Sequence, residues 1–199
     1  NIILCCMRGN GNEMENEETI RIAAEFLSDS DGVVAVDLAG AEALFPTSDY
    51  EKLFAHARAE GIPFTIHAGE AAGPESIRQA VDYGTARIGH GVNCIHDKNL
   101  MNIIAEKGIT LELCPTSNLN TKIVNDIKDY PIDKIINNKI KATINTDNMT
   151  VSGTDEASEM KLICDTFGYD GNMRRIFVNN AIDAAFLSDE MKEKLRGNL

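Results

Sequence analysis

The sequence predicts an α/β fold built on a parallel sheet. Apolar, β-branched runs alternate six times with amphipathic stretches along the 199 residues, an order typical of strands joined by right-handed helical crossovers. Polar residues gather at one end of these runs, on the edge where parallel α/β folds build their sites. Six repeats fit either a doubly wound open sheet or most of an eight-stranded barrel, which typically needs ~250 residues. We expect a single domain over residues 1–199.

The six runs are short and almost continuously apolar. Strands buried on both faces have this composition, because helices cover a parallel sheet on either side. The predicted strands are residues 2–7, 32–38, 63–67, 86–90, 109–114 and 141–146.

Helical spacing fills the intervals between the runs. In GPESIRQAVDYG, Pro74 suits a first helical turn, Ile77, Ala80 and Val81 repeat on one face, and Gly84 ends the pattern. The stretches EETIRIAAEF, DYEKLFAHARAEG and DKNLMNIIAEKG have similar spacing. After the sixth strand we expect only helices, at residues 154–167, 171–187 and 188–196.

Composition excludes several classes of function. The net charge is −12 and no cluster of Lys or Arg is visible, which argues against binding to nucleic acid or to an anionic membrane. The five cysteines are odd in number and form no C-x-x-C, so we expect neither a disulfide framework nor a cysteine zinc site. No run reaches transmembrane length and no signal peptide is visible, and we expect a cytoplasmic protein.

Residues able to do chemistry follow the strands. Each has a simpler explanation, since a lone histidine is more often structural, an aspartate can cap a helix, and Ser or Asn can form a turn. Five strand ends that carry polar residues nevertheless lie on one edge of the predicted sheet, where these residues would line a single site. The residues concerned are Asp37, Gly40, His67, Glu70, His90, Cys114 to Asn118, Asn145, Asp147 and Asn148.

The chemistry of these residues suggests a metal-assisted hydrolase. His67, His90 and Asp147 are of the types that bind and orient a divalent metal, and Glu70 is a potential proton carrier. His56 and His96 fall in or at the start of helical stretches, and we expect them at the surface.

Four motifs, HAGEAAGPESI, RIGHGV, CPTSN and NTD, resemble in their order and separation those of the adenosine deaminase family of the amidohydrolase superfamily. ILCCMR and VVAVDLAG extend the resemblance to the start of the chain. It implies a zinc-dependent (β/α)₈ barrel of the TIM type, here incomplete with about six of eight strands. The implied reaction is hydrolysis of adenosine or 2′-deoxyadenosine to inosine and ammonia in purine salvage.

The resemblance also implies a role for each motif residue. His67 and Asp147 would ligate one zinc ion, and Glu70 would protonate N1 of the purine. His90 would orient and deprotonate the attacking water. The backbone N–H of Gly40 would donate to N3.

The chain departs from the family at two places. Its members begin with a strand bearing His-x-His, which supplies two further zinc ligands, and no such motif occurs here. We therefore expect a C-terminal portion that lacks the first two barrel strands, is inactive alone, and exposes sheet edges through which it can self-associate. Asn148 also replaces the family's second aspartate, and we expect its amide to contact N7 or else only to shape the loop.

Alternative functions remain within and outside the family. An AMP deaminase would need cations for the phosphate, and the strand ends offer little beyond Arg8. An adenine or other aminopurine deaminase is closer, as is a non-enzymatic relative that kept the fold. The zinc deaminases with H-x-E and P-C-x-x-C are excluded, because neither motif is present.

Overall fold

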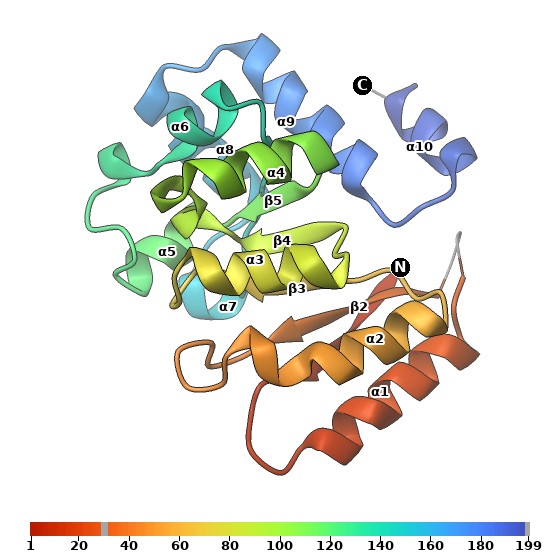
Figure 1. Ribbon diagram of the computed structural model, residues 1–199. Helices are drawn as coiled ribbons and strands as arrows, with labels where there is room; N and C mark the ends of the chain where they lie inside the picture. The colour runs from red at the N-terminus through yellow and green to blue at the C-terminus, as the bar shows by residue number, and fades with distance from the viewer. Residues whose placement is uncertain (29–31, 198–199) are drawn as a thin grey trace.

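The computed structural model describes residues 1–28 and 32–197. Within them, six strands run parallel and helices alternate with them along the chain (Figure 1). The strands are β1 (Ile2–Met7), β2 (Val33–Ala39), β3 (Thr65–Ala68), β4 (Arg87–His90), β5 (Thr110–Leu113) and β6 (Lys141–Ile144).

The strands are arranged in sequence order, as in a barrel. β1 pairs with β2, and β3, β4, β5 and β6 form a second parallel sheet. A parallel bridge between Val36 and Phe64 joins the two sheets, and the Val36 N–H donates to the Pro63 carbonyl at 3.0 Å. Among the described residues, one edge of β1 and one edge of β6 have no neighbouring strand. The fold is therefore an incomplete parallel (β/α) barrel of the TIM type.

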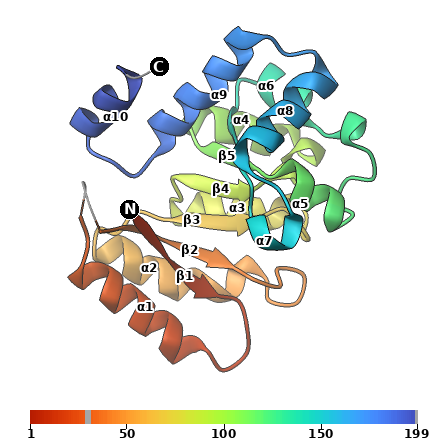
Figure 2. The same ribbon diagram turned by 180° about the vertical axis from the view of Figure 1, so that it is seen from behind.

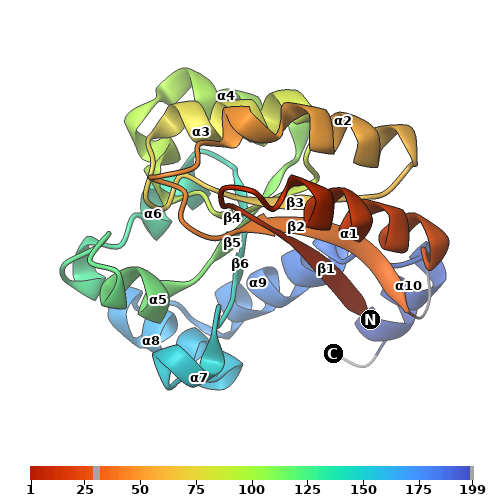
Figure 3. The same ribbon diagram turned by 90° about the horizontal axis from the view of Figure 1, so that it is seen from below.

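The helices lie on the outside of this curved sheet. Figure 3 shows α2, α3 and α4 side by side along one side of the strands. The helices are α1 (Glu13–Glu25), α2 (Glu51–Ala59), α3 (Pro74–Tyr83), α4 (Lys98–Lys107), α5 (Pro115–Asn120), α6 (Ile132–Asn137), α7 (Met149–Ser152), α8 (Glu156–Phe167), α9 (Gly171–Ala184) and α10 (Asp189–Arg196), with 3₁₀ turns at η1 (Thr47–Tyr50), η2 (Val92–His96) and η3 (Ile127–Asp129).

Local sequence explains where α3 begins and ends. Pro74 occupies its first turn, and Gly84 ends it in the left-handed conformation, with φ +86°. Ile77, Ala80 and Val81 form its buried face, as their spacing predicts. This helix packs against β3 and fixes the loop that carries Glu70.

The core lies between the sheet and the helices. Ile66, Ile88 and Leu111, from three neighbouring strands, are fully buried, as is Phe54 of α2. Figure 2 shows β1 and β2 in front of α1 and α2, so these helices cover one face of the pair. On β1, by contrast, Ile2 is 55% exposed.

The predicted elements are confirmed, with changes at their ends. α1 starts at Glu13, four residues before the periodic stretch, and α9 ends at Ala184 rather than 187. The short helices α5, α6 and α7 were not predicted, because too few residues repeat in them to show a period. In the described part of the chain, no helix is long and apolar enough to cross a membrane. All five cysteines carry free thiols.

Candidate active site

Adjacent strands bring two histidines to one edge of the sheet. His67 in β3 stands opposite Gly89 in β4, and Ala68 stands opposite His90. The ring centroids of His67 and His90 are 5.2 Å apart. Gly89 makes this approach possible, because a Cβ there would lie 2.9 Å from the His67 ring.

The backbone is strained where it presents two of the site residues. His90 has φ 60° and Asp147 has φ 54°, in the left-handed region that residues other than glycine rarely adopt. Such a conformation costs about 1–3 kcal/mol and tends to occur at functional sites. His90 is the last residue of β4, and Asp147 lies three residues beyond the end of β6.

His67 is oriented by Asp37 at the end of β2. Its Nδ1 lies 2.9 Å from Asp37 Oδ2. A carboxylate only accepts hydrogen bonds, so Nδ1 carries a proton and Nε2 is the atom able to bind a metal. Burial opposes the charged form, but the hydrogen bond and charge of Asp37 outweigh it and raise the pKa of His67 to about 9. A metal therefore competes with a proton for Nε2.

His90 has the opposite arrangement. Asn118 Nδ2 donates to its Nδ1 at 3.1 Å, so Nδ1 is the acceptor and the neutral ring carries its proton on Nε2. That nitrogen faces two carboxylates, 3.6 Å from Glu70 Oε2 and 4.0 Å from Asp147 Oδ2. Burial lowers the pKa of His90, with the nearby carboxylates opposing that effect.

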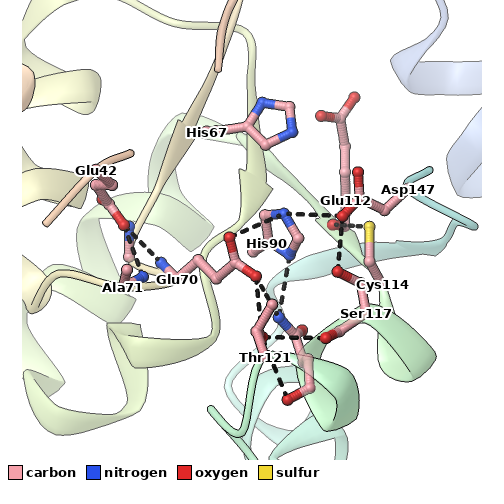
Figure 4. A network of polar contacts seen from close by, with 12 residues as sticks. Glu42, His67, Glu70, Ala71, His90, Glu112, Cys114, Ser117, Thr121 and Asp147 are labelled. Carbon is pink, nitrogen blue, oxygen red and sulfur yellow. Dashed lines mark hydrogen bonds and ion pairs between the residues drawn. The ribbon is translucent and has the colours of Figure 1, made fainter. Parts of the chain in front are cut away.

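Glu70 points its carboxylate toward His90 (Figure 4). Its Oε1 accepts hydrogen bonds from Asn118 Nδ2 and from Thr121 Oγ1, each at 3.3 Å. The carboxylate is only partly buried, with 23% of the side chain exposed, and substrate can reach it.

The loop that carries Glu70 is organised by a second glutamate, Glu42. Its buried carboxylate accepts the N–H groups of four successive residues, 69 to 72, at 2.6 to 3.1 Å. Ser76 Oγ adds a fifth hydrogen bond at 2.5 Å. Gly69 turns the chain here with φ +72°, and a Cβ would lie 2.2 Å from the Ile77 side chain. Glu42 thus fixes the backbone from which Glu70 reaches the site.

Asp147 completes the group. Ser117 Oγ donates to its Oδ2 at 2.7 Å, and no Lys or Arg pairs with it in the described ranges. One donor atom each from His67, His90 and Asp147 lie within 4.8 Å of one another. Imidazole nitrogen and carboxylate oxygen form a donor set that suits zinc. The residues present therefore fit a divalent metal.

Two further predicted residues follow β2 and β6. Gly40 follows β2 with φ +113°, and a Cβ there would stand 3.3 Å from Arg8 backbone atoms. Asn148 is exposed and begins α7, where its Oδ1 accepts the Val151 N–H at 3.0 Å. Asn148 is therefore the cap of that helix, and its Nδ2 remains able to donate.

The guanidinium of Arg8 forms its hydrogen bonds within the protein. Its guanidinium donates to the Phe45 carbonyl, to Thr47 Oγ1 and to the His67 carbonyl at 2.7 to 2.9 Å, and the residue is 5% exposed. The structure also places His56 and His96 at the surface, as predicted.

Sequence reasoning missed Glu42 and Tyr130 and underrated Asn118. Glu42 lies two residues beyond Gly40, so its place on the same strand end was a usable signal. Asn118 was interpreted as a candidate turn former, although it belongs to the set of strand-end residues. Nothing in the sequence pointed to Tyr130, whose hydroxyl donates to Asn118 Oδ1 at 3.0 Å.

Comparison with known proteins agrees with this geometry. The family model described as adenosine deaminase matches residues 1–199. A curated adenosine deaminase from Haemophilus ducreyi is 46% identical over 200 residues, which are all of this chain and 58% of the relative. The chain thus spans little more than half the length of that relative.

Solved structures share the fold. An adenine deaminase from Arthrobacter aurescens superposes with a TM-score of 0.88 at 23% identity, covering 97% of this chain and 58% of that one. The Arabidopsis protein ADAL, complexed with IMP, has a TM-score of 0.86 at 28% identity, with 98% and 56% covered. A Burkholderia ambifaria amidohydrolase with bound Zn has a TM-score of 0.86 at 23% identity, with 98% and 54% covered.

Proposed function

The chain belongs to the adenosine deaminase family, and we propose that the protein containing it hydrolyses adenosine or 2′-deoxyadenosine to the corresponding inosine and ammonia. The observation that carries this proposal is the convergence of His67, Glu70, His90 and Asp147 at one edge of the sheet. The 46% identity to a curated adenosine deaminase supports it. We further propose a role in purine salvage in the cytoplasm, which the free thiols support.

The reaction needs an acid and a base on one substrate. Water adds at C6 of the purine, the exocyclic C–N bond breaks, and the amine leaves as ammonia. Glu70 acts as the acid that protonates N1 and so accepts the electron density of the ring. His90, whose Nε2 carries a proton, donates to the attacking water and orients it, and Asp147, 4.0 Å from that nitrogen, accepts a proton from the water, which then passes to the departing amine.

We propose that zinc is the cofactor, held by His67 and Asp147. The free Nε2 of His67, its support from Asp37 and the acceptor character of Asp147 favour this assignment. The Burkholderia relative described with bound Zn is consistent with it. When bound, zinc supplies a Lewis acid that makes water nucleophilic near neutral pH. The resemblance calls for two more histidine ligands, beyond the two assigned here.

The site favours a nucleoside over a nucleotide. ADAL was solved with IMP, a nucleotide, at 28% identity. A phosphate would need cationic partners, and Arg8, which follows β1, already donates to Phe45, Thr47 and His67. We therefore propose that AMP is a poor substrate.

The isolated 199-residue chain can be used to test the proposed number of zinc ligands. We expect the isolated chain neither to turn over adenosine nor to hold one zinc per chain, since two ligands fall short of the three normal for a catalytic zinc. Metal analysis and the absorbance change from adenosine to inosine measure both. Turnover close to that of an intact family enzyme would contradict the proposed ligand set.

The complete coding sequence tests the function. Expressed with whatever precedes Asn1, it should deaminate adenosine and 2′-deoxyadenosine and leave adenine and AMP largely unchanged. A His67→Ala variant should lose metal and activity together. A folded, zinc-loaded protein that leaves both nucleosides intact would refute the proposal.

A further inference from the structure

Asn118 connects Glu70, the proposed acid, with His90, which orients the attacking water. It is fully buried in α5, and its Nδ2 donates both to His90 Nδ1 at 3.1 Å and to Glu70 Oε1 at 3.3 Å. A primary amide has two hydrogens, and both are used here. The same amide therefore aligns the acid and the histidine that orients the water.

The orientation of this amide is fixed from behind by Tyr130. Its hydroxyl donates to Asn118 Oδ1 at 3.0 Å, and the residue is 2% exposed. Burial raises the pKa of Tyr130 well above its ordinary value, so the hydroxyl keeps its proton. A flipped amide would turn its oxygen toward the carboxylate of Glu70, where two acceptors would repel each other.

We propose that Asn118, held by Tyr130, is a positioning residue that sets the tautomer of His90 and points its Nε2–H at the carboxylates of Glu70 and Asp147. His67 shows the alternative on the neighbouring strand: a carboxylate partner, Asp37, puts the proton on Nδ1 and leaves Nε2 for a metal. Two histidines 5.2 Å apart thus differ in role because one partner is an amide and the other a carboxylate. The expected effect of Asn118 on kcat rests on the proposed deaminase function, whereas its effect on the tautomer of His90 does not.

Nitrogen NMR of the isolated, ¹⁵N-histidine-labelled chain tests the tautomer without metal or substrate. Above pH ~7.5, where an ordinary histidine is neutral, His90 should carry its proton on Nε2 and none on Nδ1. In Asn118→Asp the new carboxylate accepts rather than donates, and Nδ1 should gain a proton. His56 in α2 and His96 in η2 are internal controls, whose signals should not change.

Each outcome decides the proposal. A proton on His90 Nδ1 in the unmodified chain, or a bare Nδ1 in folded Asn118→Asp, would overturn it. If Asn118→Asp does not fold by circular dichroism, Tyr130→Phe decides: release of the amide should give a mixture of His90 tautomers, and a single unchanged tautomer would refute the assignment.

Kinetics of the complete enzyme supply the second readout. Asn118→Asp should lower kcat by roughly 100-fold, the range of general acid–base effects, and change KM much less. Equal changes in kcat and KM, or none, would contradict a positioning role in chemistry. Because the NMR result does not depend on turnover, an inactive enzyme with the expected tautomer would refute the deaminase function and leave the positioning intact.

Discussion

Two polar groups lie on the strands of the second sheet, and only one of them forms a site. The rim group, His67, Glu70, His90 and Asp147, follows the carboxyl ends of the strands. The inner layer consists of Thr65 and Arg87, the first residues of β3 and β4, and of Glu112, which lies in β5 opposite Gly89. Both groups are partly or largely buried, and both contain carboxylates.

The inner layer satisfies its own charges. Arg87 Nε lies 2.7 Å from Glu112 Oε1, and Thr65 Oγ1 donates to the other oxygen at 2.9 Å. The Arg87 guanidinium also lies 4.0 Å from the centre of the Phe186 ring and donates to the Ala184 carbonyl. No charge in this layer is left over for a ligand.

The rim group, by contrast, has carboxylates whose negative charge is not neutralised by a neighbouring cation in the part of the chain that the structure describes. Its two carboxylates share a single neutral imidazole, His90, and no Lys or Arg of the described residues pairs with either of them. Acceptors without a matching cation attract one from solution. A polar cluster thus becomes a binding site through unmatched acceptors held by strained backbone, as at His90 and Asp147, rather than through polarity alone.

Glu70→Gln in the complete enzyme should have the largest effect. An amide cannot pass a proton to N1, so kcat should fall 10²–10⁴-fold, while metal content and fold persist. Metal analysis and steady-state kinetics measure the two quantities. If the Gln variant keeps more than about a tenth of kcat, Glu70 is a hydrogen-bonding partner and not the acid.

The matching change in the inner layer should affect stability instead. Glu112→Gln removes the charge that neutralises Arg87, which is 13% exposed in its side chain, and should lower the free energy of unfolding by about 3 kcal/mol. Urea titration measures it, with Glu70→Gln as the control that should change by less than about 1 kcal/mol. An equal loss of unfolding free energy in Glu112→Gln and Glu70→Gln would contradict the view that only the inner layer serves stability.

The sequence predicted the rim group but not the inner layer, because the two groups depend on interactions of different range along the chain. Strand order and the rim residues His67, Glu70, His90 and Asp147 follow from alternation and from motifs, which are local. The inner layer was not predicted, because Thr65, Arg87 and Glu112 lie in three different strands and only register brings them together. Tyr130 and Asn118 likewise meet through tertiary packing.

Glu42→Gln tests how the rim is held, with an intermediate effect expected. Its carboxylate accepts from four backbone N–H groups, and an amide would point donors at donors, at a cost of about 2 kcal/mol. We expect a lower unfolding free energy together with a fall in kcat, because the Glu70 loop loses its support. Glu42→Asp, which keeps the charge, is the control and should recover part of both. Full activity in folded Glu42→Gln would show that Glu70 needs no such support.

Asn148 should have the smallest effect, because it is exposed to solvent. Its Oδ1 is occupied by the Val151 N–H, whereas its Nδ2 can donate to purine N7. Replacing N7 by C–H would leave that donor without a partner. The cost should be about 1 kcal/mol, the low end of the usual range, since water can reach the amide.

The test compares kcat/KM for adenosine and 7-deazaadenosine in three forms of the complete enzyme. Asn148→Asp keeps a helix cap and loses the donor, whereas Asn148→Ala loses both. If Asn148 contacts N7, the unmodified enzyme should prefer adenosine by about fivefold, the equivalent of 1 kcal/mol, and the Ala variant should lose that preference. If Asn148 only caps α7, the Asp variant should behave as the unmodified enzyme does and the Ala variant should be less stable. A preference for adenosine that survives in Asn148→Ala would exclude the contact with N7, because alanine has no donor at this position.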